Sequence, residues 1–187
     1  VLLRGFADIP NASLHSYDDN MDASMVRKYT IDASAWASAT LYYWAWYQTE
    51  SSYDYCQVIV TGDAGAHWYY IGEQLTGSSS WSYHTLSIPD TYLTSLFNIG
   101  FMFHSDGSVH NFEGVYLDGI VMEYVPGPIY IRADGSVDPP TAPIHRNENL
   151  YTLTDNIYSS ASTVIVIEKN GITLDGAGYT IQGSSGV

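Results

Sequence analysis

The chain has 187 residues, of which 45% are apolar, enough for one large domain or for one domain with a further fragment. Six lysines and arginines stand against 20 aspartates and glutamates, so the formal net charge is −14. This balance argues against nucleic acid or an anionic membrane surface as partner, and it favours divalent cations and an extracellular setting.

The single cysteine, Cys56, excludes a disulfide within the chain, so packing or a metal ion has to stabilise the fold outside the cell. No apolar stretch approaches about 20 residues, so we predict no membrane insertion. The segment 1–4 is too short for the apolar part of a signal peptide, and we interpret the chain as mature or excised.

The N-terminal part contains two candidate sites. The triplet that begins at Asn11 is an N-glycosylation sequon, which matters only for an exported chain. The segment 17–22 places three acids in a turn. It is either a solvated turn or an oxygen-rich cation-binding loop, although its spacing does not fit an EF-hand.

The stretch 39–60 predicts two strands joined by an acidic turn. Both alternating faces of the first strand, Thr40–Tyr47, are aromatic, so we expect it to be covered on both sides between two sheets. In the second strand, Tyr53–Val60, Asp54 is a charge at the head of an apolar row. Its carboxylate needs a cation, a metal ion or backbone donors as its partner.

The other predicted strands follow at short, regular spacing, and no convincing amphipathic helix lies between them. They are expected at 1–6, 23–31, 67–71, 81–88, 97–104 and 115–124. In the last of them, Tyr116, Asp118, Ile120 and Met122 alternate and are expected on one face. Such a pattern is typical of an all-β protein, an antiparallel β-sandwich or jelly roll.

Several ordered motifs resemble a known family. They lie at 17–24, 31–34, 39–50, 53–60, 62–68 and 112–120. The series resembles the MAM-like, concanavalin-type jelly roll found beside immune-inhibitor-A-type secreted metallopeptidases, and the resemblance covers about residues 5–125. It implies an accessory domain rather than an enzyme, because the peptidase's His-Glu-x-x-His zinc motif is missing from this chain.

The resemblance also implies a structural calcium ion, Ca2+, near the first and last strands. Asp118 matches the acid of the family's last strand, and Asp54 matches the acid of its Tyr-Asp-Tyr motif. Either Asp8 or Asp18 is expected to supply the N-terminal ligand. Where the family commonly has two acids before the final isoleucine, this chain has Asp118 followed by Gly119, so one ligand is missing.

The C-terminal part, residues 127–187, differs from the jelly roll predicted for 1–126. Its strand–turn rhythm, with corners at Asn170-Gly171 and Asp175-Gly176, resembles the start of a right-handed parallel β-helix of archaeal and bacterial surface proteins. Copper, with which such segments are often associated, is not supported, because this part has one histidine and no methionine or cysteine. The predicted architecture is therefore a sandwich followed by a short, incomplete β-helix-like segment.

Only one or two coils fit before Val187, whereas a solenoid needs roughly three or more to bury its core. An apolar edge formed by Ile172, Leu174 and Ile181 would then be exposed. Either the chain is a fragment of a longer protein, or this edge pairs with another subunit. Open-ended pairing of that kind would build a filament.

Catalytic and sugar-binding interpretations compete with these. His104, Ser105 and Asp106 are adjacent in sequence, which rarely gives the geometry of a catalytic triad. A glycosidase pair drawn from Glu50, Asp54 and Asp118 ranks below the calcium site. Four aromatic residues are candidates for stacking on sugar rings, with a tyrosine-rich core or interface as the plainer alternative: Tyr69, Tyr70, Trp81 and Tyr83.

We therefore predict a secreted, non-enzymatic surface protein, adhesin-like or a filament-forming subunit that self-associates through strand pairing. The second hypothesis is a carbohydrate-binding accessory module of a larger secreted enzyme, with glycans as partners. The third is a fragment of a catalytic β-helix such as a polysaccharide lyase.

Overall fold

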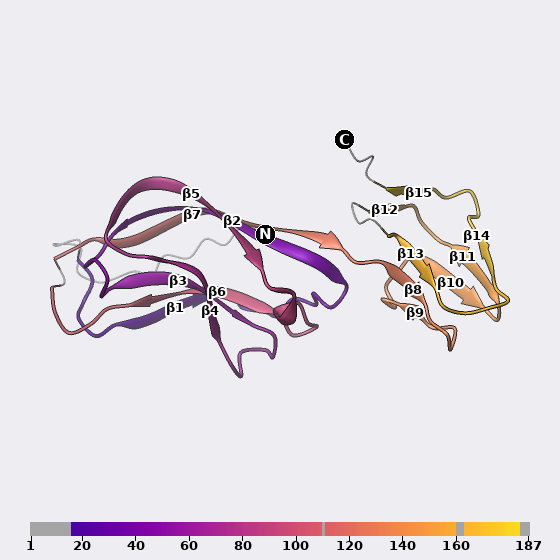
Figure 1. The fold of residues 1–187 in the computed structure, drawn as a ribbon, viewed down its shortest axis with the longest axis horizontal. Coiled ribbons are helices and arrows are strands. Elements are labelled where there is room, and N and C mark those ends of the chain that lie inside the picture. The colour runs from indigo at the N-terminus through magenta and orange to yellow at the C-terminus, as the bar shows by residue number, and fades with distance from the viewer. Residues whose placement is uncertain (1–15, 110, 160–162, 184–187) are drawn as a thin grey trace. The chain divides into compact units, whose positions relative to one another are not determined.

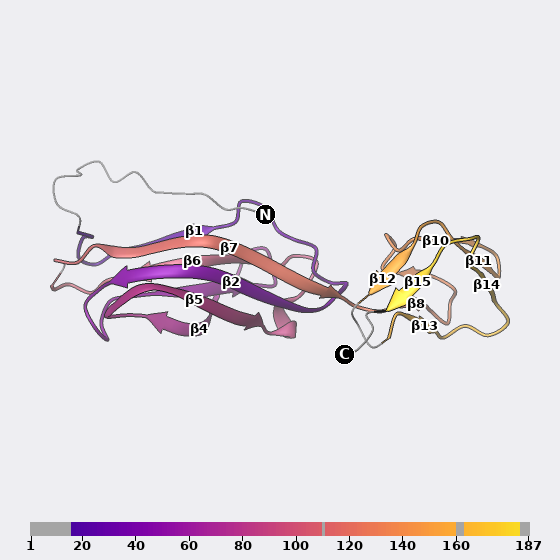
Figure 2. The ribbon, with the colours of Figure 1, turned by 90° about the horizontal axis from the view of Figure 1, so that it is seen from above.

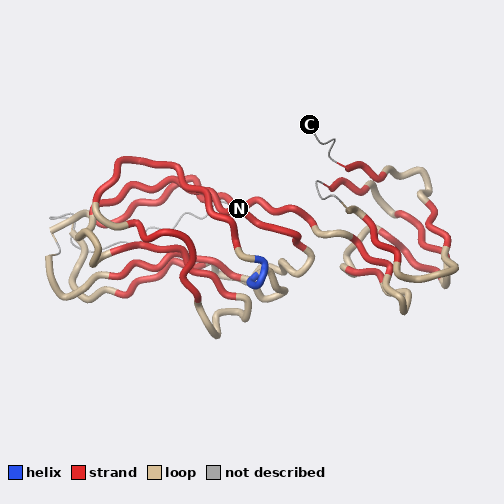
Figure 3. The backbone as a smooth tube through the Cα atoms, viewed as in Figure 1, coloured by secondary structure: helices blue, strands red, loops and turns tan. Residues whose placement is uncertain are grey.

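The chain is all-β, with antiparallel sheets in its N-terminal part. The computed structural model describes residues 16–109, 111–159 and 163–183, and in these the one helical element is a short 3-10 turn, η1 (Asp90–Tyr92) (Figure 3). No helix in this described part is long and apolar enough to span a membrane. The described residues form two compact units: 16–34 with those of Ala39–Glu123, and Ala35–Ser38 with those of 124–183.

The N-terminal unit is built from two sheets, which Figure 1 shows as two layers and Figure 2 shows from above, one over the other. One sheet has the order β1-β6-β3-β4 and the other β5-β2-β7. The strands are β1 (Asp22–Val26), β2 (Trp36–Gln48), β3 (Tyr55–Thr61), β4 (Tyr69–Leu75), β5 (Ser78–Ile88), β6 (Asn98–His104) and β7 (Gly114–Pro126). Within these sheets β1 pairs with β6, β6 with β3, β3 with β4 and β2 with β5, all antiparallel.

The core of this unit lies between the sheets and follows the alternation of the strands. Leu41, Tyr43 and Ala45 of β2 are buried, as are Val58 and Val60 of β3. Between the buried residues of β2, Trp44 is 44% exposed. The prediction that this strand is covered on both faces is therefore wrong: its aromatic outer face belongs to the surface.

A single glycine interrupts the alternation of side chains between the two faces of β7. Gly119 has a φ of +57°, a left-handed conformation that glycine adopts without strain. Tyr116 meets Trp46 on the outer face, whereas Ile120 is buried. The prediction that Tyr116 and Ile120 share one face is therefore wrong, because the strand does not alternate regularly through Gly119.

The C-terminal unit contains short strands around its own core. These are β8 (Ile129–Ile131), β9 (Val137–Asp138), β10 (Ile144–Asn147), β11 (Leu150–Leu153), β12 (Ile157–Ser159), β13 (Ile165–Ile167), β14 (Thr173–Asp175) and β15 (Ile181–Gly183). Three pairs are parallel, β8 with β13, β11 with β14 and β12 with β15. The core consists of Ile129, Ile131, Ile144, Tyr151, Leu153 and Ile157. The β-helix itself stays a prediction.

Candidate functional site

The outer face of the β5-β2-β7 sheet carries a group of aromatic side chains, which we call the aromatic face. It consists of Tyr42, Trp44, Trp46, Trp81, Tyr83 and Tyr116. The members on β2 alternate with its buried residues, and Trp81 and Tyr83 lie two positions apart on β5. The pairing of Trp44 with Tyr83 in the antiparallel ladder brings these two strands' aromatic residues together.

Ring contacts link two groups within the aromatic face: Tyr42, Trp44 and Tyr83 form one, and Trp46 and Tyr116 form the other. The ring centroids of Tyr42 and Tyr83 are 6.1 Å apart, and those of Trp44 and Tyr83 are 5.2 Å apart. Three members stay accessible: Trp44 is 44%, Trp81 49% and Tyr83 54% exposed. Antiparallel sheets usually present polar residues on a solvated face, so this group of exposed aromatic rings is a candidate binding surface.

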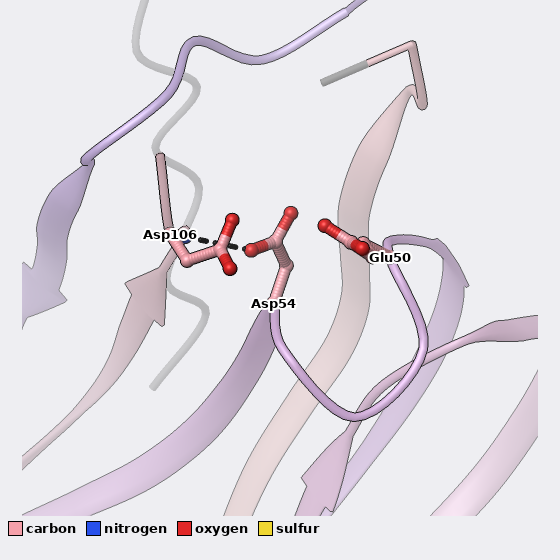
Figure 4. A group of neighbouring side chains, drawn as sticks. All are labelled: Glu50, Asp54 and Asp106. Atoms are coloured by element: carbon pink, nitrogen blue, oxygen red, sulfur yellow. Dashed lines mark hydrogen bonds between the residues drawn. The ribbon is translucent and has the colours of Figure 1, made fainter. Parts of the chain in front are cut away.

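A second feature is an acidic cluster at the end of the N-terminal unit, formed by Glu50, Asp54 and Asp106 (Figure 4). One ligand oxygen from each lies within 4.8 Å of the others. Asp54 is completely buried. Its Oδ2 accepts a hydrogen bond of 2.5 Å from the Tyr17 hydroxyl, and its Oδ1 accepts one of 2.8 Å from the backbone N–H of Asp106.

The third carboxylate of the cluster is poorly satisfied. The Oε2 of Glu50 is a buried atom without a hydrogen-bond partner among the described residues. Loss of hydration raises the pKa of Glu50, and the negative charges of Asp106, Asp54 and Asp19 raise it further. An orphaned carboxylate oxygen beside two other carboxylates is a donor set that suits a hard divalent cation such as calcium.

The predicted metal ligands do not all lie at one site. Asp54 lies in the acidic cluster. Asp18 is exposed, and its backbone carbonyl accepts a 2.7 Å hydrogen bond from Ser105 next to the cluster. Asp118 is not a member of the cluster; it is exposed on β7, where its Oδ1 accepts the N–H of Gly119. Asp8 and the sequon at Asn11 lie outside the described residues.

Sequence reasoning did not assign Glu50 and Asp106 to this site. The pairing of Tyr55 with His104 in the β3–β6 ladder brings the turn after β6 next to Asp54, and that pairing is distant in sequence. The one available signal was that both residues are acids in turns that flank predicted strands.

The predicted assembly edge lies in the C-terminal unit. Ile172 and Leu174 are partly buried against its core, and Ile181 is 44% exposed. The strands β13, β14 and β15 each have a single neighbour among the described residues, so one side of each is an open edge there.

A second polar group lies on the inner side of β5. The Oγ of Ser82 is 2.9 Å from His84 Nε2, and His84 Nδ1 is 2.9 Å from Glu73 Oε1. This is the hydrogen-bond order of a Ser-His-acid triad. The imidazole of His84, however, is stacked on Tyr43 in the sandwich, with centroids 5.0 Å apart.

No protein-family model and no curated protein matches the chain. Among the solved structures that are similar to it are the following two. One, described as "Family 16 Carbohydrate Binding Module-2", has a TM-score of 0.38 and 20% identity, and the match covers 58% of this chain and 74% of that one. The other, "Structure of infectious bursal disease virus Gx strain", has a TM-score of 0.33 and 11% identity, covering 67% and 38%.

Proposed function

We propose that this protein is a non-enzymatic carbohydrate-binding module that acts outside the cell. The observation that carries the proposal is the aromatic face, on which Trp44, Trp81 and Tyr83 are each about half exposed. The apolar C–H face of a sugar ring stacks on such rings, and an amphipathic aromatic side chain loses little conformational freedom on binding. The acidic composition supports the extracellular setting.

Retention on insoluble neutral polysaccharides, such as cellulose, chitin, xylan and mannan, tests this function. The double variant Trp44→Ala/Tyr83→Ala should lose roughly tenfold or more in affinity for the polysaccharide that retains the parent chain. Tyr29→Ala is the matched control, because Tyr29 is 66% exposed but lies outside the aromatic face. Equal retention of the double variant and the parent chain would overturn the proposal.

A calcium ion at the acidic cluster is proposed as a structural element of this module. Glu50, Asp54 and Asp106 would hold it, and each carboxylate oxygen of Asp54 keeps acceptor capacity beyond its one hydrogen bond. The positive charge of the ion would compensate the negative charges of these three neighbouring carboxylates. Calcium should raise the melting temperature of the parent chain, and an unchanged melting temperature with calcium and with chelator would remove this proposal.

Assembly through the C-terminal unit is the second candidate function, favoured by the open edges of β13, β14 and β15. Pairing of these edges between copies would give an adhesin-like or filament-forming subunit. Sedimentation velocity over a range of concentrations tests it: association should appear in the parent chain and weaken in Ile181→Asp. A monomer at every concentration would exclude it.

A further inference from the structure

The second sheet of the sandwich also presents an outer face, and that face is hollowed. A hollow of about 300 Å³ is lined by Ser24, Val26, Ile59, Trp68, Tyr70 and Met102. Its volume lies at the lower end of the range for ligand pockets. The residues come from all four strands, or the loop beside them, of the β1-β6-β3-β4 sheet, which forms the layer opposite the aromatic face (Figures 1 and 2).

The strand register explains the apolar floor. Gly100 of β6 pairs with Val26 on one side and with Ile59 on the other, and Ile59 pairs with Tyr70. A Cβ at Gly100 would lie 2.6 Å from Val26 Cγ1, so the absence of a side chain leaves room for valine there. Ile59 at the floor is only 4% exposed, whereas Tyr70 at the side is 49% exposed.

Hydrogen bonds order the loop before β4, which leads into the Trp68 wall. Asp63 Oδ1 accepts the Thr61 hydroxyl at 2.6 Å and the backbone N–H of His67 at 2.9 Å. The Trp68 Nε1 lies 3.3 Å from the position that a Cβ on Gly65 would occupy. A wall that follows directly on such an ordered loop favours binding, because less conformational entropy is lost when the ligand enters.

Charge narrows the class of ligand. None of the six described residues that line the hollow carries a charge. On the same face, Asp22 and His104 are hydrogen-bonded to each other at 2.8 Å, and the pair of Ser24 and Met102 lies two positions further along the same ladder. In a chain of net charge −14, an anionic ligand is disfavoured near such a site.

We propose that this hollow is a second sugar site, which takes one ring of a neutral sugar between Trp68 and Tyr70. The aromatic walls suit the C–H face of the ring, and the Ser24 hydroxyl provides a polar partner at the rim. The inference rests on the proposed function and extends it, because sites on opposite layers allow one molecule to hold two glycan chains.

Met102 provides a local readout of this site. The chain contains four methionines, and methyl-labelled protein gives one NMR signal for each, which Met102→Leu assigns. A panel of neutral methyl glycosides (glucoside, galactoside, mannoside and xyloside) should include one that shifts the Met102 signal saturably and leaves that of Met122 on β7 in place. Methyl glucuronoside, which is anionic, should shift neither.

Neighbouring tyrosines supply matched variants. Tyr70→Ala should weaken the binding seen at Met102 roughly tenfold, whereas Tyr69→Ala, equally exposed but outside the lining, should change it less than twofold. A Met102 signal unmoved by all four neutral glycosides, or moved equally by glucuronoside, would overturn the inference. Polysaccharide retention that depends on Trp44 and Tyr83 would still uphold the proposed function in that case, so the two failures are distinguishable.

Discussion

The hydroxyl of Tyr17 donates a 2.5 Å hydrogen bond to Oδ2 of Asp54, which is completely buried. The same hydroxyl accepts the backbone N–H of Glu50 at 3.0 Å. Burial raises the pKa of Tyr17, and the bond to Asp54 raises it further, so the phenol stays protonated and donating. One tyrosine thereby joins the segment before β1 to the turn between β2 and β3.

Removal of this hydroxyl should destabilise the protein. Tyr17→Phe keeps the ring contact with Phe103 but leaves a buried carboxylate oxygen and a backbone N–H without their partner. We expect the free energy of unfolding to fall by about 2 kcal/mol, measured by urea titration. Tyr29→Phe, at an exposed ring, should change it by less than about 0.5 kcal/mol. Equal stability of the two variants would contradict this role of Tyr17.

Glu50 makes stability depend on pH. Folding raises the pKa of Glu50. At pH values just above the ordinary pKa of a carboxyl group, the folded state therefore binds more protons than the unfolded chain does. The contribution of Glu50 is therefore most favourable at low pH and is lost as pH rises through the raised pKa. In chelator at neutral pH, Glu50→Gln should melt at a higher temperature than the parent chain, by calorimetry.

Calcium should reverse that order. In the parent chain the ion would compensate the negative charges of the three carboxylates. Glu50→Gln replaces one of these carboxylates with a neutral amide, which binds the ion less well. Added calcium should therefore raise the melting temperature of the variant less than that of the parent chain. Glu123→Gln, at an exposed position outside the cluster, is the control and should respond as the parent chain does. An identical calcium response of Glu50→Gln and the parent chain would argue against the cluster as the binding site.

The sequence predicted local pattern better than long-range contact. Alternation located the strands around Leu41 and Phe101, and both residues are buried. It could not tell whether a second layer covers Trp44, since an aromatic side chain occurs in cores and at binding surfaces alike. Asp54 was recognised from its own environment, whereas Asp106 reaches it through the β3–β6 ladder, which no local pattern specifies.

Ser82, His84 and Glu73 should be inactive as a triad. Ser82 alternates with the exposed Trp81 and Tyr83, so its side chain is directed toward the inner side of the sheet, beside the stacked imidazole of His84. We expect a fluorophosphonate to leave Ser82 unlabelled, as judged by intact-protein mass spectrometry. A trypsin sample labelled in parallel is the positive control. Labelling that disappears in Ser82→Ala would show instead that the protein has a nucleophilic serine.

Gly119 connects the backbone of β7 to the aromatic face. A Cβ at this position would lie 3.2 Å from Trp44 Cδ1, and the φ of +57° is strained for alanine. Gly119→Ala should therefore lower the free energy of unfolding by about 1–2 kcal/mol and also weaken polysaccharide retention, because Trp44 has to move. Gly178→Ala is the control: its φ is +88°, but nothing lies within 4 Å, so only stability should fall. Retention that stays intact in Gly119→Ala would mean that the position of Trp44 does not govern binding.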